Sequence, residues 1–181
     1  MDCWRISALA AAVLLASVTP TLANLVTDPG FESCPTDPPP PGWSGTAGCN
    51  IFSHTGSWAA GFEGTNTLAQ SIPTTAGTMY DFSFWVSGVD LATPTQFTAS
   101  FGSDQVLDLV NVTPTTYMFE DFTVTATAAS TTLDFTAASS AGWLLDDVSV
   151  TAVPAAVPEP PALGLFAVAT LGLAALYRRR A

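Results

Sequence analysis

Apolar and polar residues alternate along the middle of the chain, which predicts β-strands. The clearest run is 80–86, where one face holds Tyr80, Phe82, Phe84 and Val86 and the other holds Asp81, Ser83 and Trp85. The same period of two recurs at residues 97–101, 122–126, 133–137 and 144–150. No helical period is sustained between these runs, so the middle of the chain is expected to be all-β.

Turn signals separate the predicted strands. They include residues 75–77, Thr93-Pro94 and Ala141-Gly142. About eight short strands with polar turns predict one antiparallel β-sandwich with a single core, spanning residues 24–152.

The charge of this region excludes one class of partner. All four basic residues, Arg5 and Arg178 to Arg180, lie near the two ends. Of the 15 acidic residues only Asp2 and Glu159 lie outside residues 24–158, which leaves 13 acids and no Lys or Arg between them. Such a domain cannot neutralise phosphates, so we expect no nucleic-acid binding, and anionic polysaccharide is disfavoured. Neutral sugars and divalent cations remain compatible with this charge.

Residues 1–23 have the pattern of a secretory signal peptide. Arg5 supplies a positive start, residues 6–18 form an apolar run, and small residues precede a cleavage point expected before Asn24. A transmembrane anchor is the alternative, but the apolar run is short for a span.

The last residues predict a second membrane signal. A Pro-rich linker, residues 153–160, leads into an apolar stretch at 161–177 and a basic tail at 178–181. The 16 residues from Ala162 to Tyr177 span about 24 Å as a helix, short but sufficient if the arginines extend to the interface. Basic residues on the C-terminal side alone place that end in the cytoplasm. A buried core helix is disfavoured because the run has no polar face, whereas an ordinary anchor is not excluded on physical grounds.

The same segment resembles the PEP-CTERM sorting signal of exopolysaccharide-producing Gram-negative bacteria. The matching residues are Val157, Pro158, Glu159, Pro160, the apolar span, and Arg178, Arg179 and Arg180. The resemblance implies recognition by a membrane-embedded exosortase, removal of the tail, and delivery to the cell surface or extracellular matrix. The expected precursor is a single-pass inner-membrane protein.

Two cysteines remain after removal of a signal peptide that contains Cys3. Cys34 and Cys49 form an even pair in an oxidising compartment, so we expect a disulfide worth roughly 3 kcal/mol in the loop-entropy model. A metal site is the rival interpretation, which the lack of a second cysteine pair makes weak.

The predicted domain resembles galactose-binding-like jelly rolls, a superfamily that includes carbohydrate-binding modules. Four segments carry the likeness: residues 24–32, 41–43, 54–60 and 143–150. The resemblance is specific for an antiparallel jelly-roll sandwich and weak for the ligand, since one fold hosts many functions.

Asp146 is the most informative single residue. Strand alternation puts it on the same face as Val148 and Val150, toward the core, where no Lys or Arg can pair with it. The resemblance implies a structural Ca²⁺ bound by this aspartate, with Glu32 and oxygens from Gly30 and Thr55 beside it. The alternative is a carboxylate capped by backbone amides of the N-terminal segment. Asp147 is expected to face away.

Tryptophans are the candidate sugar contacts. Trp85 lies on the polar face of its strand and is a possible stacking platform, unless a neighbouring loop covers it. Trp43 and Trp58 are further candidates, although loop tryptophans more often anchor their loops.

Catalysis is not expected. His54 is the only histidine and no Lys or free Cys accompanies it, so a nucleophilic triad is hard to assemble and a role in loop structure is expected. Glu120 and Asp121 are adjacent on a strand and point to opposite faces, so they cannot flank one glycosidic bond.

The sequence thus predicts a non-enzymatic, exported protein whose sandwich binds neutral glycan, such as the cell's own exopolysaccharide. A structural matrix protein with no specific ligand is the alternative of a different class.

Overall fold

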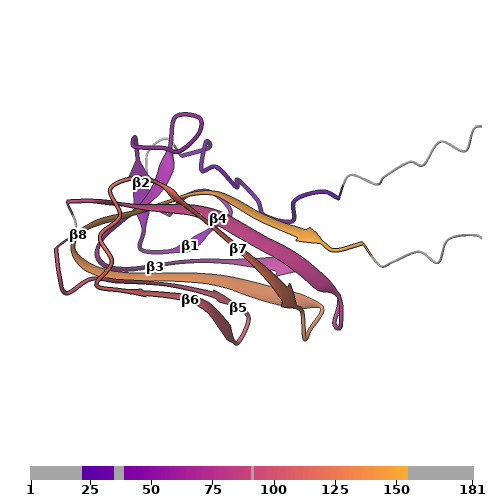
Figure 1. Cartoon of the computed structure of the whole chain (residues 1–181). Coiled ribbons are helices and arrows are strands. Elements are labelled where there is room, and N and C mark those ends of the chain that lie inside the picture. The colour runs from indigo at the N-terminus through magenta and orange to yellow at the C-terminus, as the bar shows by residue number, and fades with distance from the viewer. Residues whose placement is uncertain (1–21, 35–38, 91, 155–181) are drawn as a thin grey trace, which may run out of the picture.

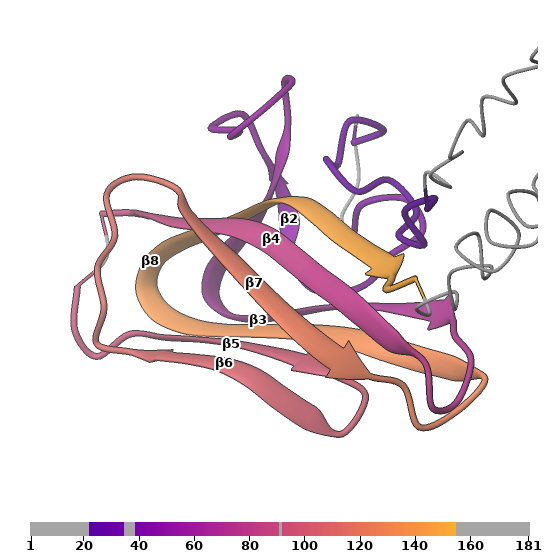
Figure 2. The same cartoon turned by 45° about the vertical axis from the view of Figure 1, so that its right-hand side comes forward.

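Two long, bent strands organise the molecule. The computed structural model describes residues 22–34, 39–90 and 92–154. Within them, β3 (Ala59–Pro73) and β8 (Ser130–Ala152) run antiparallel from the pair Ala60 and Leu145 to the pair Pro73 and Ser130. Figure 2 shows β8 curving over from one layer of the molecule to the other.

Six shorter strands complete the fold (Figure 1). They are β1 (Ser44–Gly45), β2 (Gly48–Asn50), β4 (Met79–Val89), β5 (Gln96–Phe101), β6 (Asp104–Val110) and β7 (Met118–Thr125). All recorded pairings are antiparallel and the described residues contain no helix, so the predicted all-β antiparallel architecture is confirmed.

The two halves of β8 belong to different layers. Its first half pairs with β5 and with the second half of β3, and β6 and β1 extend this layer in the order β6-β5-β8-β3-β1. Its second half pairs with β4 and with the start of β3, which gives a second layer in the order β7-β4-β8-β3-β2. We call these the β5 layer and the β4 layer.

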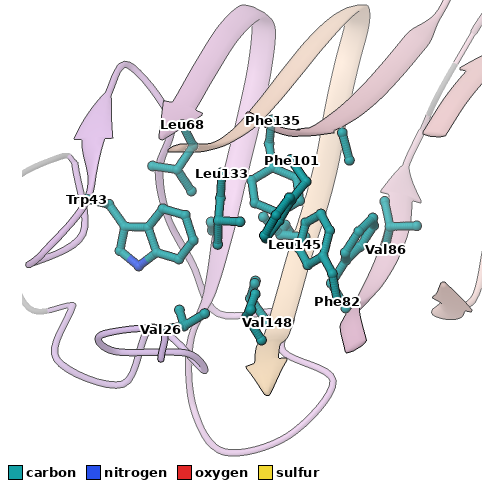
Figure 3. Close-up of a cluster of buried hydrophobic side chains, with 14 of the residues drawn as sticks. Val26, Trp43, Leu68, Phe82, Val86, Phe101, Leu133, Phe135, Leu145 and Val148 are labelled. Carbon is teal, nitrogen blue, oxygen red and sulfur yellow. The ribbon is translucent and has the colours of Figure 1, made fainter. Parts of the chain in front are cut away.

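The core lies between the layers and is rich in phenylalanine. Phe82, Phe84 and Phe135 are fully buried and their rings pack together at centroid distances of 5.2–6.0 Å. Figure 3 shows side chains from both layers, including Phe82, Phe135 and Leu145, meeting in this core. The predicted inward row Tyr80, Phe82, Phe84 and Val86 is confirmed.

The predicted turn at Ala141-Gly142 is wrong. β8 continues as a strand through both residues, and Gly142 pairs with Glu63 and with Val89. The predicted strands at 133–137 and 144–150 are therefore parts of one strand that bends, and glycine serves here as a bend within a strand.

A bulge in β8 overturns the predicted orientation of Asp146. Ser83 pairs with Ser149, but Trp85 pairs with Asp146, so two residues of β8 oppose Phe84. Asp147 lies in this bulge with a φ of 49°. The extra residue reverses the alternation, so Asp146 shares the outer face of the β4 layer with its partner Trp85 and not the inner face with Val148.

The predicted signals at the two ends lie almost entirely outside the described residues. This applies to the signal peptide, the sorting motif, the apolar span at 161–177 and the basic tail. No helix with the length and apolar character needed to cross a bilayer occurs in residues 22–34, 39–90 or 92–154.

Candidate functional site

The outer face of the β4 layer carries the candidate site. Phe119 of β7, Trp85 of β4 and Asp146 of β8 form one row of neighbours across three strands. The loop from Ile51 to Trp58, which we call the strap, crosses this row and stands above β4 in Figure 1.

Asp146 fastens the strap to β8. The side chain is fully buried, and its Oδ2 accepts hydrogen bonds from the backbone N–H groups of His54 (2.7 Å) and Thr55 (3.1 Å). Its Oδ1 accepts a third from the N–H of Asp147 at 2.8 Å. Capping by backbone amides, the alternative considered above, is thus what the structure contains, but the amides belong to the strap and to β8 and not to the N-terminal segment.

Burial dominates the electrostatics of this carboxylate. Burial raises the pKa of Asp146 to about 6. The three hydrogen bonds from backbone N–H groups lower this pKa, whereas the nearby charge of Asp147 raises it further. The same two carboxylates, together with burial as the larger cause, raise the pKa of Tyr117. Tyr117 therefore keeps its proton and donates a hydrogen bond to the carbonyl of Phe52 at 2.6 Å.

Further acids hold the rest of the strap. Asp147, expected to face away as a solvated or secondary partner, accepts hydrogen bonds from His54 Nδ1 (2.7 Å) and Thr55 Oγ1 (2.6 Å). Glu32 Oε1 accepts the backbone N–H groups of Ser57 and Trp58 at 2.8 and 2.9 Å. The loop-structural role expected for His54 is confirmed by these contacts.

The residues of the predicted calcium site do converge here. A Cβ placed on Gly30 would lie 3.6 Å from Asp147 Oδ1, 3.8 Å from Asp146 Oδ1 and 3.8 Å from Glu32 Cγ. Thr55 contributes its N–H to Asp146 and its hydroxyl to Asp147. Within the described ranges, no group of three or more His, Cys, Asp or Glu side chains is arranged to hold a metal ion. Hard oxygen donors are therefore close together, with Asp146 already satisfied by amides.

Aromatic rings cover the row beside the strap. The rings of His54 and Trp85 stack at 3.9 Å and 15°, and Phe119 lies against Trp85 at 5.1 Å. Tyr117 meets His54 edge-on at 5.3 Å. Trp85 is half-buried and His54 of the strap stacks on it, which agrees with the alternative that a neighbouring loop covers it. Its contact with glycan stays a prediction.

A hollow of about 440 Å³ opens next to these rings. Its residues come from the strap, the end of β4, the β6–β7 loop and β8, and include Phe52, Ser87, Asp90, Thr116, Tyr117 and Leu144. Ser87 and Leu144 are buried neighbours at its floor, whereas Phe52 is 58% exposed. The hollow thus combines aromatic surface, hydroxyls and one carboxylate, without any Lys or Arg in the described part of the chain.

The other two tryptophans lie elsewhere. Trp43 is buried against Phe31 and Phe135, with ring distances of 5.4 and 6.1 Å, which agrees with the alternative that it anchors its loop. Trp58 is half-buried at the end of the strap, where its backbone N–H donates a hydrogen bond to Glu32 Oε1.

The disulfide between Cys34 and Cys49 is confirmed. It joins the N-terminal segment to β2, directly before the strap begins. Glu120 and Asp121 pair with Phe84 and Ser83 respectively and lie on opposite faces, as predicted.

Sequence reasoning missed Phe52, Tyr117 and Phe119. Phe119 carries a readable signal, since it is an aromatic residue out of phase with the inward positions Phe122 and Val124 of its strand. Phe52 and Tyr117 lie in loops, where no period indicates which side chains face each other.

Sequence comparisons match no family model and no curated protein. Solved structures do match. TmCBM61 bound to β-1,4-galactotriose aligns with a TM-score of 0.54 and 15% identity over 72% of this chain and 99% of its own. The CBM22-1 xylan-binding domain of Paenibacillus barcinonensis Xyn10C aligns with a TM-score of 0.54 and 16% identity over 77% of this chain and 100% of its own.

A third match belongs to a different kind of protein. The enzymatically active domain of the bacteriophage CBA120 tailspike protein 4 aligns with a TM-score of 0.55 and 13% identity, over 72% of this chain but 21% of its own. At such identities the matches establish the fold alone, a jelly-roll β-sandwich like that of these structures.

Proposed function

We propose that this protein binds glycan non-catalytically through the hollow and the aromatic rings beside it. The observation that carries the proposal is the hollow itself, in which exposed aromatic surface meets hydroxyl groups over a buried floor. Sugar rings present apolar C–H faces and hydroxyl edges, and such a site can contact both. The jelly-roll neighbours that bind xylan and galactotriose support this class of ligand.

The ligand is a neutral polysaccharide. The net charge of the chain is −11, and no Lys or Arg lies between residues 24 and 158 to pair with a uronate, sulfate or phosphate. Asp90 and the hydroxyls of Ser87 and Thr116 are positioned in the hollow to exchange hydrogen bonds with sugar hydroxyls.

The two ends of the sequence support a proposal for the cellular setting. We propose export by the N-terminal signal, processing by exosortase at Pro158-Glu159-Pro160, and residence at the cell surface or in the extracellular matrix. Deleting residues 157–181 should then release or misroute the protein. Unchanged surface display, measured on intact cells with a protease-accessible tag, would contradict the sorting proposal.

Glycan binding is tested with a glycan array that contains xylan, galactan and exopolysaccharide fragments, followed by calorimetry on the best ligand. Phe52→Ala and Tyr117→Ala should each lower affinity at least tenfold, because each removes one wall of the hollow. Val110→Ala is the matched control, since Val110 is also exposed (55%) but is not among the residues that line the hollow. A folded protein that binds no glycan would favour the alternative function, a structural matrix protein without a specific ligand.

A structural calcium ion is proposed beside the strap. Asp146, Asp147 and Glu32 offer hard oxygen ligands, and the described residues contain no Lys or Arg to neutralise them. The ion would supply positive charge that reduces the repulsion among these acids and would hold the strap in place. A chelator should then lower the melting temperature of the wild-type protein and leave Asp146→Asn unchanged. An equal melting temperature with and without calcium would mean that the backbone amides alone satisfy Asp146.

A further inference from the structure

The edges of the two layers are protected in different ways. An exposed strand edge presents unpaired N–H and C=O groups that can pair with another chain, and native sheets block such edges with short strands, bulges or inward-pointing charges. At one side of the sandwich the terminal strands β1 and β2 have 2 and 3 residues, too short to template a partner. At the other side the terminal strands are β6 and β7, and both are long.

β6 is interrupted by a bulge. Its register against β5 shifts between Ala99 and Ser100, where Val106 is left without an opposite residue. A bulge twists the edge and disrupts the row of free backbone groups. Asp104 and Asp108 also place charge along this strand.

β7 is neither short nor interrupted by a bulge. It pairs with β4 in continuous register from Met118 opposite Val86 to Thr125 opposite Met79, and within the described residues it has no other strand partner. Its sequence, MFEDFTVT, contains no Pro, Gly or Lys and is rich in strand-forming residues. The backbone of β7 is therefore suited to pair with a strand of a second copy of the chain.

Glu120 is the exception in the inward row of β7. Met118, Phe122 and Val124 of this row pack on the core, and Glu120 pairs with the fully buried Phe84. Among the described residues the structure gives the Glu120 carboxylate no hydrogen bond and no ion pair. Burial accordingly raises the pKa of Glu120. Burying an unpaired carboxylate costs free energy, so Glu120 opposes the folding of the monomer. Stabilisation of the monomer therefore does not explain why an acid occupies this position.

We propose that Glu120 keeps the free edge of β7 from pairing with β7 of a second copy. Two copies of an antiparallel edge strand can pair about a two-fold axis, which would join two β4 layers into one continuous sheet. That pairing would place the Glu120 carboxylates of both copies among the apolar side chains at the new junction and remove both from water. The resulting desolvation and repulsion favour the monomer.

The test compares substitutions at two adjacent acids. Glu120→Leu should convert a monomer into a species of twice the mass, measured by size-exclusion chromatography with light scattering over a range of concentrations. It should also raise the melting temperature. Asp121→Leu removes the same charge from the outer face of the same strand, and it should remain monomeric. Glu120→Gln keeps the shape of the side chain and should associate more weakly than Glu120→Leu.

Hydrogen exchange identifies the surface involved. In the associated form, the amides of β7 that do not bond β4 should become protected, whereas those of β6 should not. A wild-type protein already dimeric through β7 would overturn the proposal, and so would a folded Glu120→Leu variant that remains monomeric. Should Glu120→Leu fail to fold, Glu120→Gln decides between the same two outcomes.

Discussion

The two outer faces of the sandwich share the strands β3 and β8 but differ in chemistry. The outer face of the β5 layer holds short hydroxyl side chains in register, with Thr67 and Thr98 both opposite Thr136, and Ser71 opposite Thr132. The outer face of the β4 layer holds Phe119, Trp85 and Asp146, with the strap laid across them. One face is a plain sheet surface and the other carries the candidate site.

The difference originates in the bulge of β8. Without the extra residue at Asp147, strand alternation would direct Asp146 into the core, where no partner for it exists. With it, Asp146 and Asp147 both reach the strap and accept its backbone and side-chain donors. On the hydroxyl face the side chains satisfy each other instead, as Ser71 and Thr132 do at 3.2 Å. The inserted residue therefore brings two carboxylates to the face on which the strap lies.

The largest expected contrast is between Asp146 and Asp134. Asp146→Ala leaves three N–H groups without an acceptor and should lower the free energy of unfolding by about 3 kcal/mol. Asp134 lies on the outer face of the β5 layer, and its carboxylate accepts one hydrogen bond, from the hydroxyl of Thr136. Asp134→Ala should therefore lower the free energy of unfolding by no more than about 0.5 kcal/mol. Urea unfolding of both variants in chelator checks this, and equal losses would contradict the assignment of the strap to Asp146.

Removing the ring beneath the strap should have the next largest effect. Trp85→Ala deletes the surface on which His54 stacks and should cost about 2 kcal/mol, since the side chain is half-buried. Limited proteolysis should then cleave within residues 51–58. Gln96→Ala is the control on the hydroxyl face, because Gln96 bonds only Asp108 across the surface. An uncleaved strap in the Trp85 variant would show that the carboxylates hold it unaided.

The dependence of stability on pH should separate the faces further. Burial raises the pKa of Asp146 to about 6, whereas an aspartate in the unfolded chain titrates near 4. Between about pH 4 and 6 the folded state retains a proton that the unfolded state has lost, so stability should fall as pH rises, by about 1–2 kcal/mol. Asp146→Asn should have a shallower profile in chelator than Asp134→Asn, which keeps the titrating group. Parallel profiles would mean that Asp146 titrates normally.

The smallest effect is expected from one hydroxyl group. Tyr117→Phe removes the hydrogen bond to the Phe52 carbonyl and should cost about 1 kcal/mol while loosening the wall of the hollow. Thr98→Val, which removes a long 3.5 Å contact to Thr136 on the other face, should change stability by less than about 0.5 kcal/mol. Thermal unfolding of the two variants provides the comparison, and equal shifts would remove Tyr117 from the list of residues that position the strap.

Alternation predicted the all-β architecture because a strand with one buried and one exposed face alternates apolar and polar residues along the sequence. The inward row from Tyr80 to Val86 was recovered in this way. The pairing of Cys34 with Cys49 was recovered separately, from the number of cysteines left after the predicted signal peptide. The orientation of Asp146 was not, because a bulge changes the phase and depends on the register of the neighbouring strand. Ala141-Gly142 was misread because glycine marks bends within strands as well as turns between them. Phe52 and Tyr117 escaped notice because contacts between loops leave no periodic signal.

The position of β8 along the chain has a consequence for folding. β8 is the last described strand, yet it is the central strand of both layers, between β3 and β5 in one and between β3 and β4 in the other. Neither layer can therefore be completed until residues 130–152 have been synthesised. Its contacts with β3 and β4 join residues far apart in the sequence, which is typical of slowly folding proteins. Before Ser130 the strands can form only the separate pairings of β1 and β2 with β3, β4 with β7, and β5 with β6. The two complete layers should therefore assemble in a late step that requires β8.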